Sequence, residues 1–283
     1  MIWADGRLQD GPLLAIAAGD RGLTLADGLF ETILVARGRP HRLDEHLGRL
    51  AAGAAVLRFA APLDEVRAAV LALAATEPGR AALRVTVTRG AGARGLALPA
   101  VPQPTVFGSI APFDTGLVFR PVTLATSAIR RNEQSPLSRV KSLAYMDNVL
   151  ALAEAVDAGA GDALLLNTAG RVACTSAGNL FAVVDGVLAT PPVEDGVLPG
   201  IARAELLAAG RIAGLAVAER SLSPADLAAA SAVFSTNSLR LVTPVTAIDG
   251  RAVEDRAGIA AAALALLQRG VDAVAAGGEP LVS

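Results

Sequence analysis

Apolar side chains recur at helical spacing in several stretches of the chain. Between residues 43 and 57 they stand at Leu43, Leu47, Leu50, Ala54 and Leu57, which places them on one face of a helix. The same reasoning predicts further helices over residues 62–76, 145–158, 199–213, 224–229 and 258–275. Gly and Pro residues stand at most of the expected ends of these helices, as is typical of helix termini.

Strand-like segments alternate with these helices. Leu83, Val85 and Val87 take every second position within residues 82–89, which is typical of a half-buried strand. Further strands are predicted at 28–36, 105–110, 122–127, 162–167, 180–184, 187–188, 232–235 and 245–248, and a hairpin at 2–8. This is a mixed α+β pattern in two unequal halves. We expect a first domain over residues 1–115, a linker over 116–121 and a second domain over 122–283.

Composition narrows the class of protein. The chain has 283 residues, of which 53% are hydrophobic and 18% charged, so it can bury a substantial core. Its net charge of -2 gives no reason to expect a nucleic acid or an anionic membrane as partner. A single cysteine and two histidines offer neither an internal disulfide nor a zinc ligand set, so we expect no metal. Without a signal-peptide pattern or a membrane-spanning apolar run, a cytoplasmic location is expected.

A glycine-rich stretch, Gly90-Ala91-Gly92-Ala93-Arg94-Gly95, matches the dinucleotide-binding fingerprint and follows a predicted strand. That fingerprint also requires a helix to begin at its last glycine. Here Leu96-Ala97-Leu98-Pro99 follows, which disfavours a helix. We therefore interpret residues 90–99 as a loop and exclude a Rossmann site.

One residue stands out chemically. Lys141 is the only lysine, because all other members of the 25 basic residues are arginines. Arginine does not lose its proton in proteins, whereas a desolvated lysine does and then acts as a nucleophile. A codon bias towards arginine explains the missing lysines but not the one that survives. Lys141 is therefore a candidate reactive amine. His46 and Cys174, by contrast, are interpreted as packed residues when considered alone.

Several motifs taken together resemble the class IV aminotransferase superfamily of pyridoxal-5'-phosphate (PLP) enzymes. They occur in the family's order and cover about residues 1–250. The stretches that carry the resemblance are Asp20-Arg21-Gly22, Asp27-Gly28-Leu29-Phe30-Glu31-Thr32, His46-Leu47-Gly48-Arg49-Leu50, Lys141 to Asn148, Ser176-Ala177-Gly178-Asn179-Leu180-Phe181, Gly196-Val197-Leu198-Pro199-Gly200-Ile201-Ala202-Arg203 and Ser235-Thr236-Asn237-Ser238-Leu239. The resemblance implies a two-domain fold-type IV enzyme with a small α/β domain and a larger β-barrel-like α/β domain. It also implies a small-molecule amino substrate and a homodimer.

The resemblance assigns roles to particular residues. Lys141 would hold the cofactor as a Schiff base and then act as general acid and base. The residues expected to contact the phosphate are Arg49, Ile201, Ala202, Thr236 and Asn237. Of these, the backbone N–H groups at a helix start suit an anion, and Arg49 adds a charged fork. Tyr145, one helical turn after Lys141, would share its face and donate to the cofactor's phenolate oxygen.

One position departs from the family pattern. The family places a glutamate five residues before the Asn of its Asn-Leu-Phe run, where it pairs with the protonated pyridine nitrogen. Cys174 stands at this position. A neutral thiol holds a proton on that nitrogen less firmly than a carboxylate does. The substitution therefore puts efficient transamination in doubt.

The motifs favour one subgroup over others. In the pattern that D-amino-acid aminotransferases share, a Tyr stands at the position that corresponds to residue 30, and Arg-x-His stands at 94–96. This chain has Phe30 and Arg94-Gly95-Leu96 there, so the resemblance to that subgroup is weaker. Residues 88–95 and Asn237-Ser238-Leu239 look closer to aminodeoxychorismate lyases. Phe30 and Arg94 are the expected substrate-binding residues. The leading interpretation is a lyase that eliminates pyruvate to give 4-aminobenzoate. The alternatives are a transaminase for D-amino acids, (R)-amines or branched-chain amino acids, and a PLP-binding relative with little catalysis.

Overall fold

The computed structural model describes residues 1–277, which form two compact units. The first unit holds residues 1–114, together with Val140–Ala144 and residues 271–277. The second holds Thr115–Arg139 and Tyr145–Gly270. The change of unit at residue 114 lies close to the predicted boundary at 115. The two returns of the chain to the first unit were not predicted, because sequence patterns report local structure and not which segments pack together.

The first unit is built on one antiparallel sheet with the order β2-β1-β6-β5-β3-β4. The strands are β1 (Ile2–Ala4), β2 (Arg7–Gln9), β3 (Gly28–Ala36), β4 (Arg39–Pro40), β5 (Arg80–Thr88) and β6 (Thr105–Pro112). Their alternating side chains send one set, including Ile33, Leu83 and Val85, into a fully buried core. The hairpin of β1 and β2 and the bounds of β3 agree with the sequence predictions.

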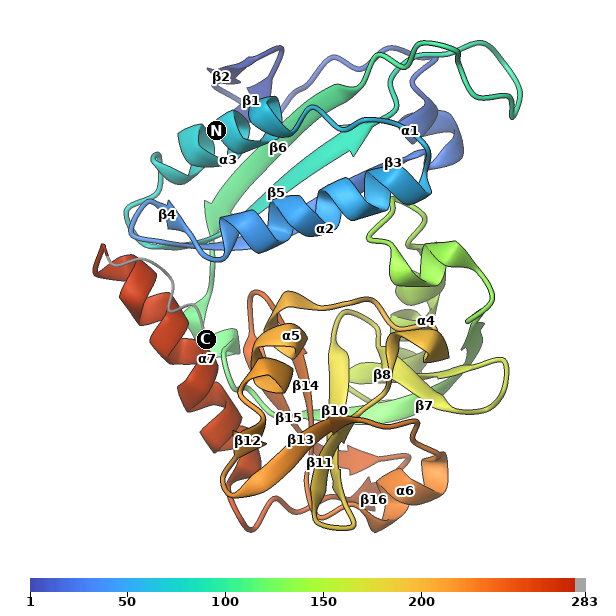
Figure 1. Ribbon diagram of the computed structural model, residues 1–283, viewed down its shortest axis with the longest axis vertical. Helices are drawn as coiled ribbons and strands as arrows, with labels where there is room; N and C mark the ends of the chain where they lie inside the picture. The colour runs from blue at the N-terminus through green and yellow to red at the C-terminus, as the bar shows by residue number, and fades with distance from the viewer. Residues whose placement is uncertain (278–283) are drawn as a thin grey trace. The chain divides into compact units, whose positions relative to one another are not determined.

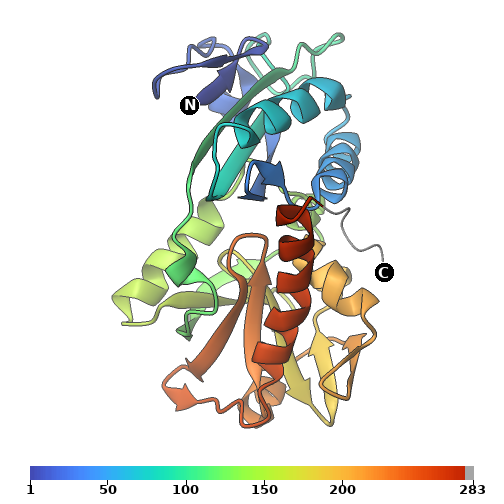
Figure 2. The same cartoon turned by 90° about the vertical axis from the view of Figure 1, so that its left-hand side faces the viewer.

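Helices cover the core face of this sheet. The long helices α2 (Leu43–Val56) and α3 (Leu63–Ala74) lie side by side on it (Figures 1 and 2). Their buried residues, such as Leu47, Leu50 and Val70, join the strand residues in one apolar cluster. A short helix, α1 (Arg21–Leu25), precedes β3 and was not predicted, because five residues show no helical periodicity. Both long helices were predicted from their apolar spacing.

The second unit is built on a ten-stranded mixed sheet that closes on itself. Its strands are β7 (Val122–Arg131), β8 (Asp162–Asn167), β9 (Val172–Thr175), β10 (Asn179–Val184), β11 (Val187–Thr190), β12 (Arg211–Ile212), β13 (Leu215–Glu219), β14 (Val233–Asn237), β15 (Leu241–Ile248) and β16 (Arg251–Ala252). The order β10-β14-β15-β7-β8-β9 returns to β10 through the pairing of Asn179 with Cys174. This ring confirms the predicted barrel-like domain. Leu180, Leu164 and Val233 contribute to its buried cluster.

Helices of the second unit pack around the barrel. They are α4 (Met146–Asp157), α5 (Ile201–Ala208), α6 (Pro224–Ala229) and α7 (Ile259–Ala275), of which α7 ends in the residues assigned to the first unit. Short 3-10 helices lie at Thr115–Leu117, Pro136–Arg139 and Val193–Asp195. α4 packs against β7 and β8, and α5 packs against β13 and β14. In the part of the chain that the structure describes, no helix is long and apolar enough to cross a membrane.

Two predictions for this unit were wrong in detail. The helix expected over 199–213 ends at Ala208, because Gly210 adopts a positive φ and the chain turns into β12. Its alanine-rich sequence favours a helix, but a hairpin through Ala213 and Gly214 takes precedence. The strands β9, β12, β13 and β16 were also not predicted, because each has at most five residues and carries no clear alternation. Residues 90–99 contain no helix, which confirms the prediction of a loop there.

Candidate active site

Lys141 lies in an extended segment that pairs with the edge of β3. The N–H of Phe30 donates to the Lys141 carbonyl at 3.0 Å, and Leu143 donates to the Gly28 carbonyl at 3.0 Å. Residues 141–145 are therefore not helical, and α4 begins only at Met146. The prediction that Tyr145 lies one helical turn after Lys141 on a shared face was wrong, because pairing with β3 holds this segment extended. Tyr145 instead occupies the N-cap position of α4, in the second unit.

The Lys141 amine lies against an aromatic ring and is poised to lose its proton. Its Nζ is 4.2 Å from the centre of the Phe30 ring. Burial, together with the positive charges of Arg49 and Arg84, lowers the pKa of Lys141 to about 8, although Glu31 opposes this. A lysine with a pKa near neutrality offers a substantial fraction of free amine, the form that attacks carbonyl groups. The structure thus gives the only lysine the chemistry that its sequence position suggested.

A buried ionic cluster lies next to this lysine. The carboxylate of Glu31 on β3 accepts hydrogen bonds from Arg49, from Nε to Oε1 at 2.9 Å and from Nη2 to Oε2 at 2.6 Å. Its Oε2 also lies 2.6 Å from His46 Nδ1. Burial raises the pKa of Glu31, but Arg49 and His46 outweigh it and hold the pKa at about 2. Burial also lowers the pKa of His46, which is packed in the core as expected. Sequence reasoning quoted Glu31 within a motif and assigned it no role. A charged residue inside an otherwise apolar strand was the available signal.

In the second unit, the N-terminus of α5 has backbone N–H groups suited to an anion. Its N-cap is Gly200, which offers no side chain to the helix N–H groups. A Cβ at Gly200 would lie 1.9 Å from the Asn179 Oδ1, so a larger residue here would displace the Asn179 amide. The N–H groups of Ile201 and Ala202 belong to the first turn, where no intrahelical acceptor exists. The positive end of the helix dipole adds to their affinity for an anion.

The end of β14 supplies a second set of donors. α5 packs against β14, which ends in Thr236 and Asn237. The Thr236 hydroxyl is buried and has no hydrogen-bond partner among the described residues. The Asn237 Oδ1 accepts from the N–H groups of Leu239 at 3.0 Å and Arg240 at 2.8 Å, which fixes the turn that follows. An orphaned buried hydroxyl beside a helix start fits a phosphate group, which accepts hydrogen bonds from both.

Cys174 lies on β9, opposite Asn179 of β10 and Leu165 of β8. Burial raises the pKa of its thiol, and the positive charge of Arg131 opposes this only in part. The thiol is therefore neutral at physiological pH. Arg131 donates to Asn148, whose Nδ2 donates to the Ser176 carbonyl at 2.7 Å. The sequence analysis quoted Asn148 at the end of a motif without a role and missed Arg131, because polar contacts among distant segments leave no local pattern.

The predicted residues fall into both units. Phe30, Arg49, Arg94 and Lys141 belong to the first, while the second holds Tyr145, Cys174, Ile201, Ala202, Thr236 and Asn237. Arg94 lies on the exposed loop after β5. Within the first unit the structure brings Lys141, Phe30 and Arg49 together, and within the second it packs α5 against β14 and sets Gly200 against Asn179. The phosphate role of Arg49 stays a prediction, since two of its nitrogens bind Glu31.

Each unit, taken by itself, offers groups that suit part of PLP, and one residue of the second unit departs from the family pattern. Lys141 supplies an amine of lowered pKa for the cofactor aldehyde, and the α5 start with Thr236 supplies phosphate donors. At Cys174, the residue predicted to face the pyridine nitrogen in place of the family's glutamate, burial keeps the thiol neutral. Among residues 1–277, no group of three or more His, Cys, Asp or Glu side chains is placed to hold a metal ion.

Known proteins share this arrangement of sequence and fold. A putative branched-chain-amino-acid aminotransferase of Methanocaldococcus jannaschii is 34% identical over 259 residues, covering 90% of each chain. A branched-chain aminotransferase of Thermoproteus uzoniensis has a TM-score of 0.88 at 28% identity, covering 95% of this chain and 94% of that one. The 4-amino-4-deoxychorismate lyase of Pseudomonas aeruginosa has a TM-score of 0.83 at 33% identity, covering 97% of this chain and 100% of that one.

These structures share the fold-type IV architecture predicted for this chain. The family model described as amino-transferase class IV matches residues 28–248. That span includes the Glu31–Arg49 cluster, Lys141, the α5 start and Thr236. The chain therefore belongs to the class IV aminotransferase family of PLP-dependent enzymes.

Proposed function

We propose that this enzyme is an aminodeoxychorismate lyase, which eliminates pyruvate and forms 4-aminobenzoate. The observation that carries the proposal is the neutral, buried thiol of Cys174, at the position where the family resemblance expects a glutamate paired with the pyridine nitrogen. In the lyase reaction the substrate ring becomes aromatic as pyruvate leaves, and this gain supplies driving force. A cofactor with a weaker hold on its ring proton is better tolerated there than in transamination.

The residues divide the work as follows. When bound, PLP supplies an aldehyde for amines and a ring that withdraws electrons. Lys141 holds the cofactor through its Nζ and, once the substrate amine has replaced it, moves protons as general acid and base. The N–H groups of Ile201 and Ala202 and the Thr236 hydroxyl hold the phosphate. Arg94 binds a substrate carboxylate, and Phe30 packs against the substrate.

We further propose that the active unit is a homodimer in which the 88–96 loop reaches towards the partner's cofactor. An exposed apolar face of α4 supports this proposal, because such a face is favourable to bury against a second subunit. Met146, Val149, Leu150 and Val156 of α4 recur at helical spacing and are all at least half exposed, with Val156 at 59%. Apolar side chains gathered on one helix face favour association through that face. A reducing compartment such as the cytoplasm suits the free Cys174.

A transaminase is the second candidate. The relatives named branched-chain aminotransferases support it, as does the presence of Lys141 and of donors suited to a phosphate. Phe30, in place of the tyrosine of D-amino-acid enzymes, weighs against the D-specific version. The retention of both Lys141 and Arg49 weighs against a PLP-binding relative with little catalysis.

One experiment separates these candidates. The holoenzyme is incubated with aminodeoxychorismate, and in parallel with D- or L-amino acids plus 2-oxoglutarate or pyruvate. Release of pyruvate and 4-aminobenzoate from the first mixture supports the lyase. Formation of a new amino acid in the second, without activity in the first, supports the transaminase. A cofactor absorption band unchanged by every donor supports the non-catalytic relative.

A further inference from the structure

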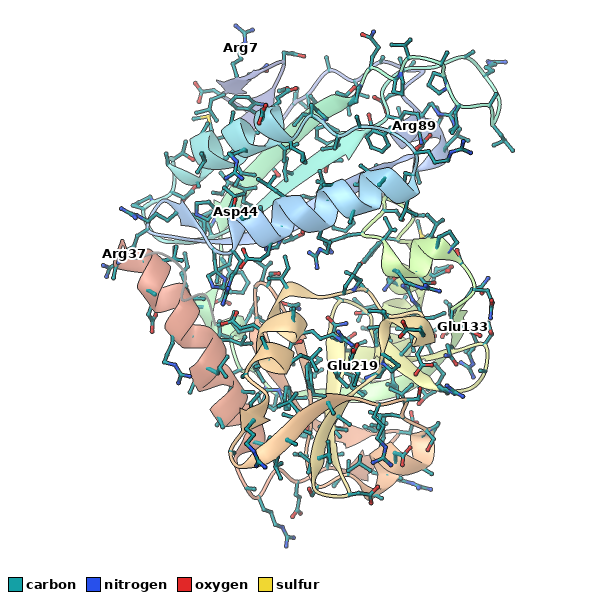
Figure 3. All side chains as sticks on the ribbon, in the orientation of Figure 1. Arg7, Arg37, Asp44, Arg89, Glu133 and Glu219 are labelled. Carbon is teal, nitrogen blue, oxygen red and sulfur yellow. The ribbon has the colours of Figure 1, made fainter. Side chains whose placement is uncertain are left out.

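Two buried arginines share one carboxylate oxygen in the first unit. Asp27 Oδ2 accepts from Arg21 Nε at 2.8 Å and from Arg89 Nε at 2.7 Å. Burial raises the pKa of Asp27, but the hydrogen bonds and charges of Arg89 and Arg21 outweigh it and lower the pKa. The carboxylate is therefore ionised and anchors both guanidinium groups. Figure 3 labels Arg89, which follows β5 directly and lies near α1.

The two arginines direct their remaining donors to different segments. Arg21 Nη1 donates to the carbonyls of Gly95 and Ala97, at 3.2 Å each. Arg89 donates instead to the carbonyls of Leu57 and Arg58, which follow α2. Arg21 thus binds the loop after β5, while Arg89 binds the end of a helix. Arg21 and Arg89 bind the same carboxylate, but only the Arg21 guanidinium also binds residues 95 and 97 of the loop.

Backbone contacts tie the other end of the loop to the same segment. The Arg21 N–H donates to the Gly90 carbonyl at 2.9 Å, and the Gly92 N–H donates to the Gly19 carbonyl at 3.1 Å. Residues 90–97 are therefore held at both ends by residues 19–21, with the exposed Arg94 between them. Three glycines within residues 90–95 give this segment unusual conformational freedom, so fixing it needs such contacts.

We propose that Arg21 is a positioning residue, which holds the 90–97 loop so that Arg94 is fixed for a substrate carboxylate. The proposal rests on the proposed function in that Arg94 binds substrate, and it adds the group that sets Arg94 in place. A guanidinium suits this task because its planar fork donates in several fixed directions and stays charged. A lysine at position 21 donates from a single point, so it cannot reach Asp27 and both carbonyls together.

The test compares Arg21→Lys with Arg89→Lys, which loses the same kind of bond to Asp27 but whose guanidinium donates to Leu57 and Arg58 and not to residues 90–97. Trypsin cleaves after arginine and needs a locally mobile chain, so the cleavage rate after Arg94 reports the loop. Cleavage after Arg256, whose side chain is 85% exposed, is the internal reference. We expect Arg21→Lys to accelerate cleavage after Arg94 about tenfold relative to Arg256. Arg89→Lys should leave that ratio unchanged.

A second measurement links the loop to substrate. In steady-state kinetics with aminodeoxychorismate, Arg21→Lys should raise KM about tenfold while kcat falls less. Combining Arg21→Lys with Arg94→Ala should be no worse than Arg94→Ala alone, since both act through one group. Additive effects would overturn the proposal. If the wild-type enzyme does not turn over aminodeoxychorismate, the proposed function fails, whereas the cleavage ratio still decides the role of Arg21.

A variant within the loop provides a second test in case Arg21→Lys does not fold. A Cβ at Gly92 would lie 3.1 Å from the Arg21 Cδ, so Gly92→Ala presses on the contact and leaves Arg21 in place. It should also accelerate cleavage after Arg94, by a smaller factor. Equal ratios in wild type, Arg21→Lys and Gly92→Ala would overturn the proposal. So would equal acceleration by Arg21→Lys and Arg89→Lys, because the effect would then reflect the shared loss at Asp27.

Discussion

Lys141 Nζ lies 4.2 Å from the centre of the Phe30 ring, and the backbones of the two residues are hydrogen-bonded. The ring removes water from the amine while its face attracts the cationic form. Arg84 lies over the same ring, with its Cζ 3.7 Å from the centre. A second fixed cation near the amine favours the neutral form. These contacts, with Arg49 and Glu31, place the lysine where both protonation states are accessible.

The first prediction concerns the pH dependence of cofactor capture. With a pKa of about 8, Lys141 is cationic below that pH and neutral above it. The rate at which the apoprotein captures PLP should therefore rise through pH 8 and level off above it. Borohydride reduction followed by peptide mapping should place the label on Lys141 at each pH, and Lys141→Arg should abolish it. An inflection near the ordinary lysine value of 10.5 would contradict this prediction.

The second prediction concerns Glu31→Gln. Removing one member of a buried ion pair leaves the other charged and unpaired, which costs about 3–5 kcal/mol of unfolding free energy. Because the Glu31 charge raises the pKa of Lys141, the variant should also shift the capture inflection below pH 8. Denaturant unfolding and the capture profile measure the two effects. Asp44→Asn, which breaks an exposed pair with Arg67 near the start of α2 (Figure 3), should cost less than about 1 kcal/mol.

Glu31 also predicts how stability depends on pH. Its folded pKa of about 2 lies below the ordinary 4.5, so its ionised form favours the folded state. That contribution is complete above pH 4.5 and is lost as pH falls towards 2, by about 3 kcal/mol. The Glu31→Gln variant should lack this part of the acid sensitivity. Parallel acid-unfolding curves for wild type and variant would show that other carboxylates set the transition.

The third prediction concerns the orphaned hydroxyl of Thr236. Thr236→Val removes a donor that has no partner in the described part of the chain, so the apoprotein should be no less stable. PLP affinity should fall about tenfold, because a hydrogen bond to a charged phosphate is worth about 1.5–3 kcal/mol. Thr190→Val is the matched control: its buried hydroxyl donates to the Leu180 carbonyl at 2.7 Å, so it should lose stability and keep its phosphate affinity. Thermal unfolding and PLP titration distinguish the two.

The fourth prediction concerns association through α4. Val149→Glu and Val156→Glu place charges on the exposed apolar face of this helix, so together they should convert the proposed dimer to a monomer. Light scattering after size-exclusion chromatography measures the mass. Leu13→Glu, at a position that is 85% exposed in the first unit, should leave the mass unchanged. A dimeric double variant would place the interface elsewhere.

Local patterns predicted most of the fold. The long helices and the strand β3 follow from apolar spacing and from turn residues, which act over a few positions. The strand β9 and the short helix α1 were missed because neither is long enough to show a period. The helix start at Gly200 was found through its motif, but its cause, the approach of Asn179, is a contact between distant segments.

The candidate site was predictable in its residue types and less so in its electrostatics. Lys141 was identified from its uniqueness, and its lowered pKa depends on Phe30, Arg49 and Arg84, which come from other elements. Tyr145 was misplaced because helical spacing was extended back past Met146, into a segment that pairs with β3. Burial of a charged group is decided by tertiary packing, so Glu31 carried no role until its partners were known.

The last prediction concerns the electron sink of the cofactor. Cys174→Glu introduces a carboxylate that can form a charge-assisted hydrogen bond to a protonated pyridine nitrogen. Such a bond is worth about 1.5–3 kcal/mol, so a step that depends on ring protonation should gain about ten- to a hundredfold. Amino-group transfer to a 2-oxo acid should therefore rise more than pyruvate elimination, which draws on aromatisation.

Cys174→Gln is the control that separates charge from volume. Glutamine matches the size of glutamate without its charge. Both are larger than the buried cysteine, so both variants test whether the packing around residue 174 accepts a larger side chain. Rates are compared at matched PLP occupancy, established from the cofactor absorbance. If Cys174→Glu accelerates transamination and Cys174→Gln does not, the missing carboxylate limits this enzyme. Unchanged or slower transamination in a fully occupied Cys174→Glu variant would mean that another group sets the protonation of the ring nitrogen. Arg131, a charged neighbour of Cys174, would then be the next residue to test.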